Sequence, residues 1–236
     1  GDVSFDSYTG ASLHILAGGS VTLGDVEINA ADSRENSINP NNTALFNGSD
    51  TFASLSEVTL SDGRVINIDG SSKPTLDVRA GIDWNSFPGG LPCIFNPGNE
   101  NVISVGNAAT SADISTGYIS IADGGDGGQL LFTNQYRNNG NLTGDILLNG
   151  EIDAKDALQG GKLDFDSRGG ITVNGIIDAS GFEVETVNGG DISLFAAGDI
   201  AVNDGAGIFS NGAISGNIIL NSGGDITLTR INNAPS

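Results

Sequence analysis

Several residue types are scarce in this chain, and each scarcity excludes a class of protein. The 236 residues include no methionine, one tryptophan and one cysteine, Cys93, which cannot form an internal disulfide. No apolar run approaches the roughly 20 residues that a membrane-spanning helix requires. The sequence therefore excludes a disulfide framework and predicts no insertion into a membrane. It begins at Gly1 without a signal peptide, so we expect a mature or excised segment.

Basic residues are also few. Nine lysines and arginines stand against 29 aspartates and glutamates, which gives a net charge of −20. This acidity disfavours nucleic acid and anionic membrane surfaces as partners, because both carry negative charge. Aromatic residues make up 6% of the chain, while glycine reaches 36 residues without a collagen period. Because no stretch shows sustained helical periodicity, this composition favours an all-β protein over a helical bundle.

A repeated unit organises the chain and is clearest at residues 218–228. There, apolar residues alternate with others on both sides of a glycine-rich turn, which predicts two short strands joined by a corner. The same pattern recurs at 13–23, 163–173 and 192–202. In all four copies the second strand begins eight residues after the first. A spacing kept this closely indicates a structural repeat.

The distance between copies predicts the architecture. Successive first strands from Leu130 to Ile218 are 33, 29 and 26 residues apart, which is long enough for one turn of a coil. A strand pair that buries every second residue cannot make a core alone, so it must stack on its neighbours. A third strand follows in each turn, since 149–154 matches 174–179. We predict a single domain, 1–236, that forms a parallel β-helix (β-solenoid) with three strands per rung.

Two irregular insertions interrupt the repeat, at 32–74 and 85–110. In the first, Asp62-Gly63 lies between two alternating runs, which predicts a β-hairpin that leaves the coil before the chain returns at Thr75. The second contains three prolines, which exclude regular strands. Such excursions either carry the specificity of a regular scaffold or only cover one end or side of the coil. Both interpretations remain open at this point.

Gly-Asp pairs recur before the strands. They are Gly144-Asp145, Gly190-Asp191, Gly198-Asp199 and Gly224-Asp225. Glycine at a corner supplies a positive φ and aspartate bonds its own backbone there, so we predict a structural role and no metal site. Calcium remains an alternative because hard cations bind several oxygen ligands. The segment most similar to a calcium repeat, 124–130, occurs once.

The residues that could support catalysis do not form a catalytic set. Asp153 and Asp178 occupy the same position in successive rungs, and two nearby carboxylates can act as acid and base in glycoside hydrolysis. However, these two residues follow the repeat, whereas a catalytic set should depart from it. His14 lies between two apolar strand residues and is predicted to point outward into solvent, and Cys93 to be a small buried or half-buried residue. We predict no catalytic and no cofactor-binding residue, and no enzyme activity.

Four aromatic residues offer a second interpretation of the irregular segments. They are Trp84, Phe87, Phe95 and Tyr118. Together they could form a sugar-stacking patch, but aromatic side chains also serve to cover an apolar end or flank of the coil. We favour the covering role.

Three passages resemble filamentous haemagglutinin-like exoproteins, in particular large cyanobacterial members. They are residues 1–23, residues 74–84 and the Gly-Gly-Asp-Ile-Thr-Leu stretch that ends at Leu228. The resemblance implies a right-handed parallel β-helix, export by two-partner secretion through an outer-membrane barrel, and a role as an adhesin or surface fibre. The amino-terminal secretion domain of that family is not recognisable here, and the Asn39-Pro40-Asn41 fragment is not assigned to it. The resemblance provides no catalytic residue.

These observations predict a secreted structural or adhesive β-helix, at the cell surface or in an extracellular filament. Its first partner is another copy of itself, joined end to end through the coil edges, with the last rung at 218–228 as one docking edge. A surface glycan or polysaccharide is the second partner. The alternative function is a carbohydrate-binding or polysaccharide-cleaving β-helix module. An ice- or mineral-binding solenoid would need a regular threonine column, which Thr172 and Thr227 do not extend.

Overall fold

The computed structural model describes most of the repeated region of the chain. The described residues are 1–32, 57–68, 70–82, 111–122, 125, 127–134, 143–182, 186–229 and 231–232. Within these residues the secondary structure is entirely β, with no helix, and all strand pairs but one are parallel. The prediction of an all-β protein built from parallel strands is therefore confirmed.

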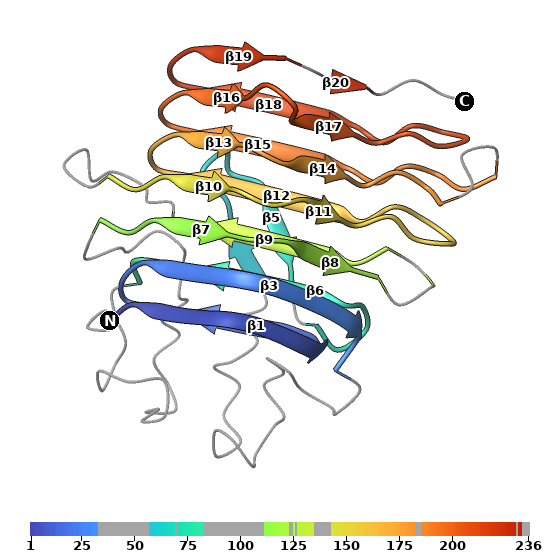
Figure 1. Ribbon diagram of the computed structural model, residues 1–236, viewed down its shortest axis with the longest axis horizontal. Coiled ribbons are helices and arrows are strands. Elements are labelled where there is room, and N and C mark those ends of the chain that lie inside the picture. Colours follow the sequence, from blue (N-terminus) through green and yellow to red (C-terminus); the bar gives the residue numbers. More distant parts are fainter. Residues whose placement is uncertain are drawn as a thin grey trace.

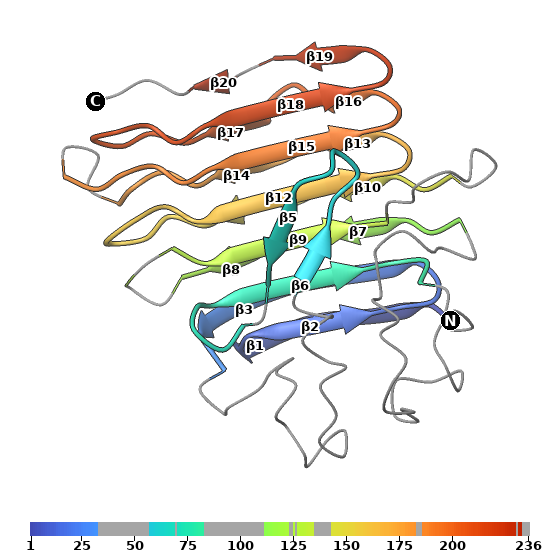
Figure 2. The same ribbon diagram turned by 180° about the vertical axis from the view of Figure 1, so that it is seen from behind.

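One sheet contains six strands stacked in parallel. Its strands, in spatial order, are β18 (Ile218–Ser222), β15 (Ile192–Ala196), β12 (Lys162–Ser167), β9 (Gln129–Thr133), β6 (Thr75–Arg79) and β2 (Leu13–Leu16). Figure 2 shows these strands one above another, with β2 near one end of the stack and β18 near the other. From β2 to β18, each strand in the stack comes from a later part of the chain than the strand before it. This order is expected when each coil is laid on the previous one.

A second sheet contains twelve strands and has two arms that meet at β3 (Val21–Ala30). The first arm contains β7 (Ile114–Thr116), β10 (Ile146–Leu148), β13 (Ile171–Val173), β16 (Ile200–Val202) and β19 (Ile226–Leu228). The second arm contains β8 (Ile119–Ile121), β11 (Ile152–Asp153), β14 (Ile176–Asp178), β17 (Gly207–Phe209) and β20 (Ile231–Asn232). The twelfth strand, β1 (Val3–Ala11), pairs in parallel with β3. Figure 1 shows both arms side by side.

The chain visits these three stacks of strands in a fixed order. It passes from β12 to β13 and β14, then from β15 to β16 and β17, and finally from β18 to β19 and β20. Each set pairs in parallel with the set before it. This arrangement is consistent with a β-solenoid. The 218–228 stretch forms β18, a corner and β19, as its alternation predicts.

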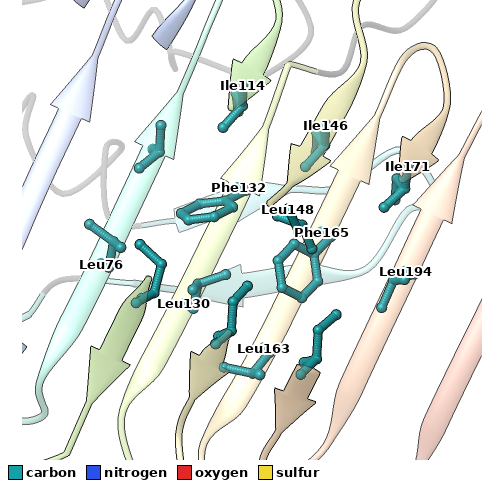
Figure 3. Close-up of a cluster of buried hydrophobic side chains, with 14 of the residues drawn as sticks. Leu76, Ile114, Leu130, Phe132, Ile146, Leu148, Leu163, Phe165, Ile171 and Leu194 are labelled. Carbon is teal, nitrogen blue, oxygen red and sulfur yellow. The ribbon is translucent and has the colours of Figure 1, made fainter. Parts of the chain in front are cut away.

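The core consists of columns of apolar side chains that follow the strand register. One column contains residues that are all fully buried, namely Val21, Ile114, Ile146, Ile171 and Ile200. Across the interior, the rings of Phe132 and Phe165 pack edge to face, with centroids 5.7 Å apart and an interplanar angle of 81°. Figure 3 shows both rings among the aliphatic side chains of several coils. The core is therefore continuous along the stack.

Corner aspartates bond to the next coil, and the prediction that they bond their own turn is wrong. Asp145 Oδ1 accepts a hydrogen bond from the backbone N–H of Gly170 at 2.7 Å. Asp199 Oδ1 likewise accepts one from the N–H of Asp225 at 2.8 Å. Parallel strands lie about 4.8 Å apart, so a carboxylate on one coil reaches the corner amide of the coil above it. These bonds join successive coils at the same corner.

Most of the predicted corner glycines are explained by close packing between coils. A Cβ atom at Gly224 would lie 2.0 Å from Asp199 Oδ1, and one at Gly190 would lie 1.9 Å from the carbonyl oxygen of Gly161. In the described residues, positive φ values occur at Gly63, Gly70, Gly81, Gly144 and Gly205. The prediction that corner glycines supply a positive φ is therefore wrong for Gly190, Gly198 and Gly224. At Gly190 a Cβ atom would overlap the backbone of the neighbouring coil, and at Gly224 it would overlap the Asp199 carboxylate, whereas at Gly198 its nearest neighbour would lie 3.1 Å away and would have to shift only slightly.

The one antiparallel pair in the described residues joins β4 (Glu57–Thr59) to β5 (Val65–Asn67). Gly63, in the turn between them, has a φ of +88°. This is the hairpin predicted from Asp62-Gly63. In Figure 2, β4 and β5 run across the strands of the six-stranded sheet. The hairpin therefore covers part of one outer face of the coil.

Several predictions fall on residues outside the described ranges. The irregular excursion at 85–110 and residues 33–56 of the first insertion are among them. So are the side chains of Trp84, Phe87, Cys93 and Phe95. These predictions, and the division of the chain into one domain with two insertions, remain predictions.

Candidate functional site

The hairpin is fixed to the outer face of the six-stranded sheet by a small apolar cluster. Its members are Val58, Leu60, Ile66 and Ile68 from the hairpin and Leu131 from β9. Leu131 lies between the inward-facing residues Leu130 and Phe132, so its side chain points away from the main core. All five cluster residues are buried, with exposures of 5% or less. The coil therefore has a second, separate core on its outside.

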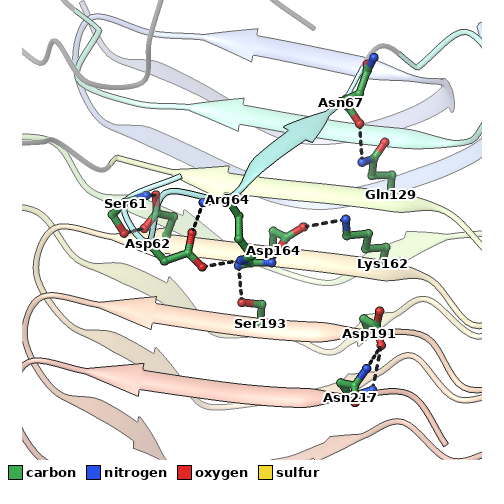
Figure 4. A network of polar contacts seen from close by, with 11 residues as sticks. Ser61, Asp62, Arg64, Asn67, Gln129, Lys162, Asp164, Asp191, Ser193 and Asn217 are labelled. Carbon is green, nitrogen blue, oxygen red and sulfur yellow. Dashed lines mark hydrogen bonds and ion pairs between the residues drawn. The ribbon is translucent and has the colours of Figure 1, made fainter. Parts of the chain in front are cut away.

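Polar contacts extend the hairpin over two further coils (Figure 4). Arg64 Nη1 lies 3.0 Å from Asp164 Oδ1 on β12, and its Nη2 donates to Ser193 Oγ on β15 at 2.7 Å. The backbone N–H of Ser61 donates to Asp166 Oδ2 at 2.9 Å, and the Ser61 hydroxyl donates to Asp166 Oδ1. The hairpin thus contacts β9, β12 and β15, three successive strands of one sheet. It acts as a clamp across the coils.

The hairpin also contacts Asp164, a buried titratable group on β12. Its side chain is 2% exposed, and burial raises the pKa of the carboxyl although the positive charges of Lys162 and Arg64 act to lower it. A folded-state pKa above the unfolded value of about 3.9 means that folding favours the protonated acid. Asp164 therefore contributes most to stability below about pH 4, and that contribution is lost as the pH rises through its folded-state pKa.

We expect the Asp164→Asn variant to gain stability relative to the unmodified protein as the pH rises above about 4. The amide stays neutral, so the variant avoids the cost of ionising a buried carboxyl. Urea unfolding from pH 4 to 7 measures this difference. Asp204→Asn, at an exposed turn position, is the control and should show no such trend. A constant difference between Asp164→Asn and the unmodified protein over this range would contradict the assignment.

His14 is not solvated, contrary to the sequence prediction. Its side chain is 9% exposed, and Nδ1 lies 3.0 Å from Oδ2 of Asp77, which is fully buried. Arg79 donates to the same carboxylate from Nε at 2.8 Å and from Nη2 at 2.7 Å. Burial alone would raise the pKa of Asp77, but the Arg79 charge and the hydrogen bonds from His14 and Arg79 outweigh it and lower the pKa. His14 does point away from the core, but into a polar cluster.

Asp153 and Asp178 are paired in register on adjacent strands, as the repeat predicts. The Nζ atom of Lys155 lies 3.6 Å from a carboxylate oxygen of each. This lysine bridges the two acids, and the repeat pattern gave no indication of it. Burial acts to lower the pKa of Lys155, but the nearby carboxylates raise it. The lysine remains charged and occupies the space between the two carboxylates.

Tyr118, from the proposed aromatic patch, is 41% exposed.

The end of the stack at β18, β19 and β20 is open within the described residues. Each of these strands pairs with one neighbour only. Ile226 is 45% exposed, Leu228 43% and Ile231 38%. The residues at the same positions one coil earlier, Ile200, Val202 and Ile208, are fully buried. Exposed apolar side chains beside unpaired strand edges are a template for further pairing.

The opposite end of the stack presents β1 and β2. In β1, Val3 and Phe5 pack against the core and are partly buried, as is Tyr8 further along the strand. Val3 and Phe5 align with Val21 and Leu23 of β3, so they belong to the same columns as Ile226 and Leu228 at the other end. The two ends therefore carry the same apolar–polar–apolar pattern in the same register.

These features define a class of protein: an all-β chain of stacked parallel strands, consistent with a β-solenoid, with a hairpin across one face. No family model, no curated protein and no solved structure matches this chain. The resemblance to filamentous haemagglutinin-like exoproteins is therefore not tested by any match and remains a prediction. In the described residues no helix is long and apolar enough to cross a membrane. The same residues contain no cluster of three or more His, Cys, Asp or Glu side chains suited to a metal ion.

Proposed function

We propose that this chain is a secreted structural or adhesive β-solenoid, part of a surface fibre or extracellular filament, that associates end to end with copies of itself. The observation that carries this proposal is the exposure at the last described coil. Ile226 and Leu228 are more than 40% exposed, while their counterparts one coil earlier are fully buried. A further coil laid on this edge would bury them and pair the open strands.

A second copy offers a matching edge at β1. With the strands kept parallel and in register, Ile226 would lie over Val3 and Leu228 over Phe5. Asp225 would continue the corner bonding, since the preceding corner residue Asp199 already accepts the N–H of Asp225 at 2.8 Å. In the twelve-stranded sheet the repeat thus passes from one molecule to the next without changing its pattern. This head-to-tail contact generates an open filament rather than a closed dimer.

We also propose the handedness of the coil and the number of strands in each of its turns. We take the coil to be right-handed, because connections between parallel strands of one sheet are right-handed in nearly all cases. We assign three strands to each coil, one in the six-stranded sheet and one in each arm of the other. The order from β12 to β20 supports this assignment. Secretion and surface display rest on the resemblance alone.

We propose no enzymatic role. The two carboxylates in register, Asp153 and Asp178, are bridged by Lys155, and Asp166 accepts two hydrogen bonds from the hairpin. These contacts support a structural use of the acids and do not favour a polysaccharide-cleaving module. Carbohydrate binding is a separate function, and a pocket beside the hairpin favours it.

The double variant Ile226→Lys/Leu228→Lys tests the association. An ammonium group buried at the contact lacks a partner, so we expect the concentration for half-association to rise at least ~100-fold. Sedimentation velocity over a concentration series measures it.

The control is Leu158→Lys/Ile214→Lys, which adds the same charge at loop positions that are 66% and 69% exposed. This control should associate as the unmodified protein does. If both double variants associate equally well, the C-terminal edge is not the contact.

A further inference from the structure

A pocket of about 320 Å³ lies beside the hairpin, at the N-terminal ends of β6, β9 and β12 in the six-stranded sheet. It is lined by Asn67, Ser72, Lys73, Gly127, Gly128, Gln129 and Lys162. Gln129 and Lys162 are partners in register on neighbouring strands, and the Gln129 amide donates to the carbonyl oxygen of Asn67 in β5 at 2.8 Å. Figure 4 shows these three residues together at the edge of the hairpin. The hairpin therefore forms one wall of the pocket.

The pocket concentrates positive charge in an acidic protein. Two of the nine basic residues, Lys73 and Lys162, line it, and none of the described residues that line it is acidic. Lys73 precedes β6 and Lys162 begins β12, which lie on either side of β9. The two strands are about 10 Å apart, so the lysines approach the pocket from opposite sides.

These two lysines are less engaged with carboxylates than the other lysine and the hairpin arginine. In the described residues, Lys73 makes no ion pair within 4.0 Å, and Lys162 lies 4.0 Å from Asp164 Oδ2 with a side chain that is 48% exposed. By contrast, Lys155 bridges two aspartates and Arg64 lies 3.0 Å from Asp164. Both pocket lysines can therefore turn their ammonium groups to an incoming anion.

The remaining lining groups define the rest of the ligand. Among the described residues they are a serine hydroxyl, two side-chain amides and two glycines, and none of them is an aromatic or large apolar residue. Such a surface suits a molecule that is polar on all sides, which excludes a fatty acid or an aromatic acid. The volume lies at the lower end of the range for small-ligand sites. A sugar ring carrying a carboxylate meets all of these requirements.

We propose that this pocket binds a uronic acid unit of an acidic polysaccharide, with Lys73 and Lys162 holding the carboxylate and the amides and hydroxyl holding the ring hydroxyls. The inference deepens the adhesive part of the proposed function and rests on it. The overall charge of −20 does not prevent binding, because charges beyond about 8 Å are largely screened at physiological salt.

Calorimetric titration of the full chain with a trimeric oligouronate tests the proposal. Saturable binding that weakens with added salt is expected, with no binding of the matching neutral trisaccharide. Lys73→Ala/Lys162→Ala should weaken binding at least tenfold. Lys155→Ala, which removes a lysine engaged with two aspartates, should leave it unchanged. Circular dichroism checks that each variant keeps its β structure.

Three results would overturn the assignment. They are no binding of oligouronate at millimolar concentration, equal binding by the double lysine variant, and binding of inorganic phosphate as tight as that of oligouronate. The edge variant Ile226→Lys/Leu228→Lys should still bind oligouronate, because none of the described residues that line the pocket belongs to β18, β19 or β20. Loss of association and loss of sugar binding are therefore distinguishable.

Discussion

Replacing Phe165 with alanine should lower the free energy of unfolding by about 3–5 kcal/mol. The Phe165 side chain is 1% exposed and packs edge to face on Phe132. Its removal leaves a cavity in the centre of the stack, where apolar columns on both sides are held in place by strand register. The backbone cannot close this cavity without breaking pairing with β9 and β15.

Urea unfolding followed by circular dichroism measures the change. Phe182→Ala is the matched control, because this phenylalanine is 74% exposed and its truncation should change stability by less than ~0.5 kcal/mol. Similar losses in the two variants would contradict the placement of Phe165 in a continuous core.

The second large effect is expected at the buried polar cluster on β6. Asp77→Asn should destabilise the fold by about 3–5 kcal/mol at neutral pH. The carboxylate is fully buried and receives two hydrogen bonds from Arg79, beside His14. An amide lacks the charge and has one acceptor oxygen, so it cannot reproduce these contacts. Asp6→Asn, on the exposed side of β1, is the control and should be nearly neutral.

The pH dependence of this effect has a defined sign. The pKa of Asp77 is lowered in the folded state, chiefly by Arg79 acting against burial, so its stabilising contribution is complete above the unfolded value of about 3.9. That contribution is lost as the pH falls through the folded-state pKa. The difference between Asp77→Asn and the unmodified protein should therefore be constant above about pH 5 and shrink in stronger acid. A difference that grows on acidification would contradict the pairing.

Most of the fold was predictable from the repeat in the sequence. Alternation in 218–228 and its copies predicted strands with the observed register, because a parallel stack buries the same position in every coil. Asp62-Gly63 predicted the hairpin for a local reason, because that pair favours the positive φ that Gly63 adopts in the turn. Features that repeat with the coil, or that depend on adjacent residues, are thus readable without the structure.

The cover on the outer face was not predictable. Alternation showed that His14 points outward but not that it pairs there with Asp77, because that partner lies 63 residues later in the chain. For the same reason, Asp164 and Asp166 gave no sign that a hairpin about 100 residues earlier binds them. The pocket at Lys73 and Lys162 likewise forms only when separate coils are stacked.

The asparagines that follow the strands of the first arm are one further signal in the sequence. Asn149, Asn174 and Asn203 each follow a strand of the first arm, and their side chains form a ladder with bonds of 3.0 and 2.7 Å. Identical polar residues at one position of a repeat predict such a ladder. The same reasoning would have shown that corner aspartates bond between coils rather than within a turn.

The most direct test of the central claim is electron microscopy of the purified protein across a range of concentrations. End-to-end association predicts unbranched filaments, with an axial repeat of about 34 Å for seven stacked strands of one molecule. Filaments should be absent in Ile226→Lys/Leu228→Lys and present in Leu158→Lys/Ile214→Lys. Single separate particles at every concentration, or filaments with the same repeat in the edge variant, would contradict it.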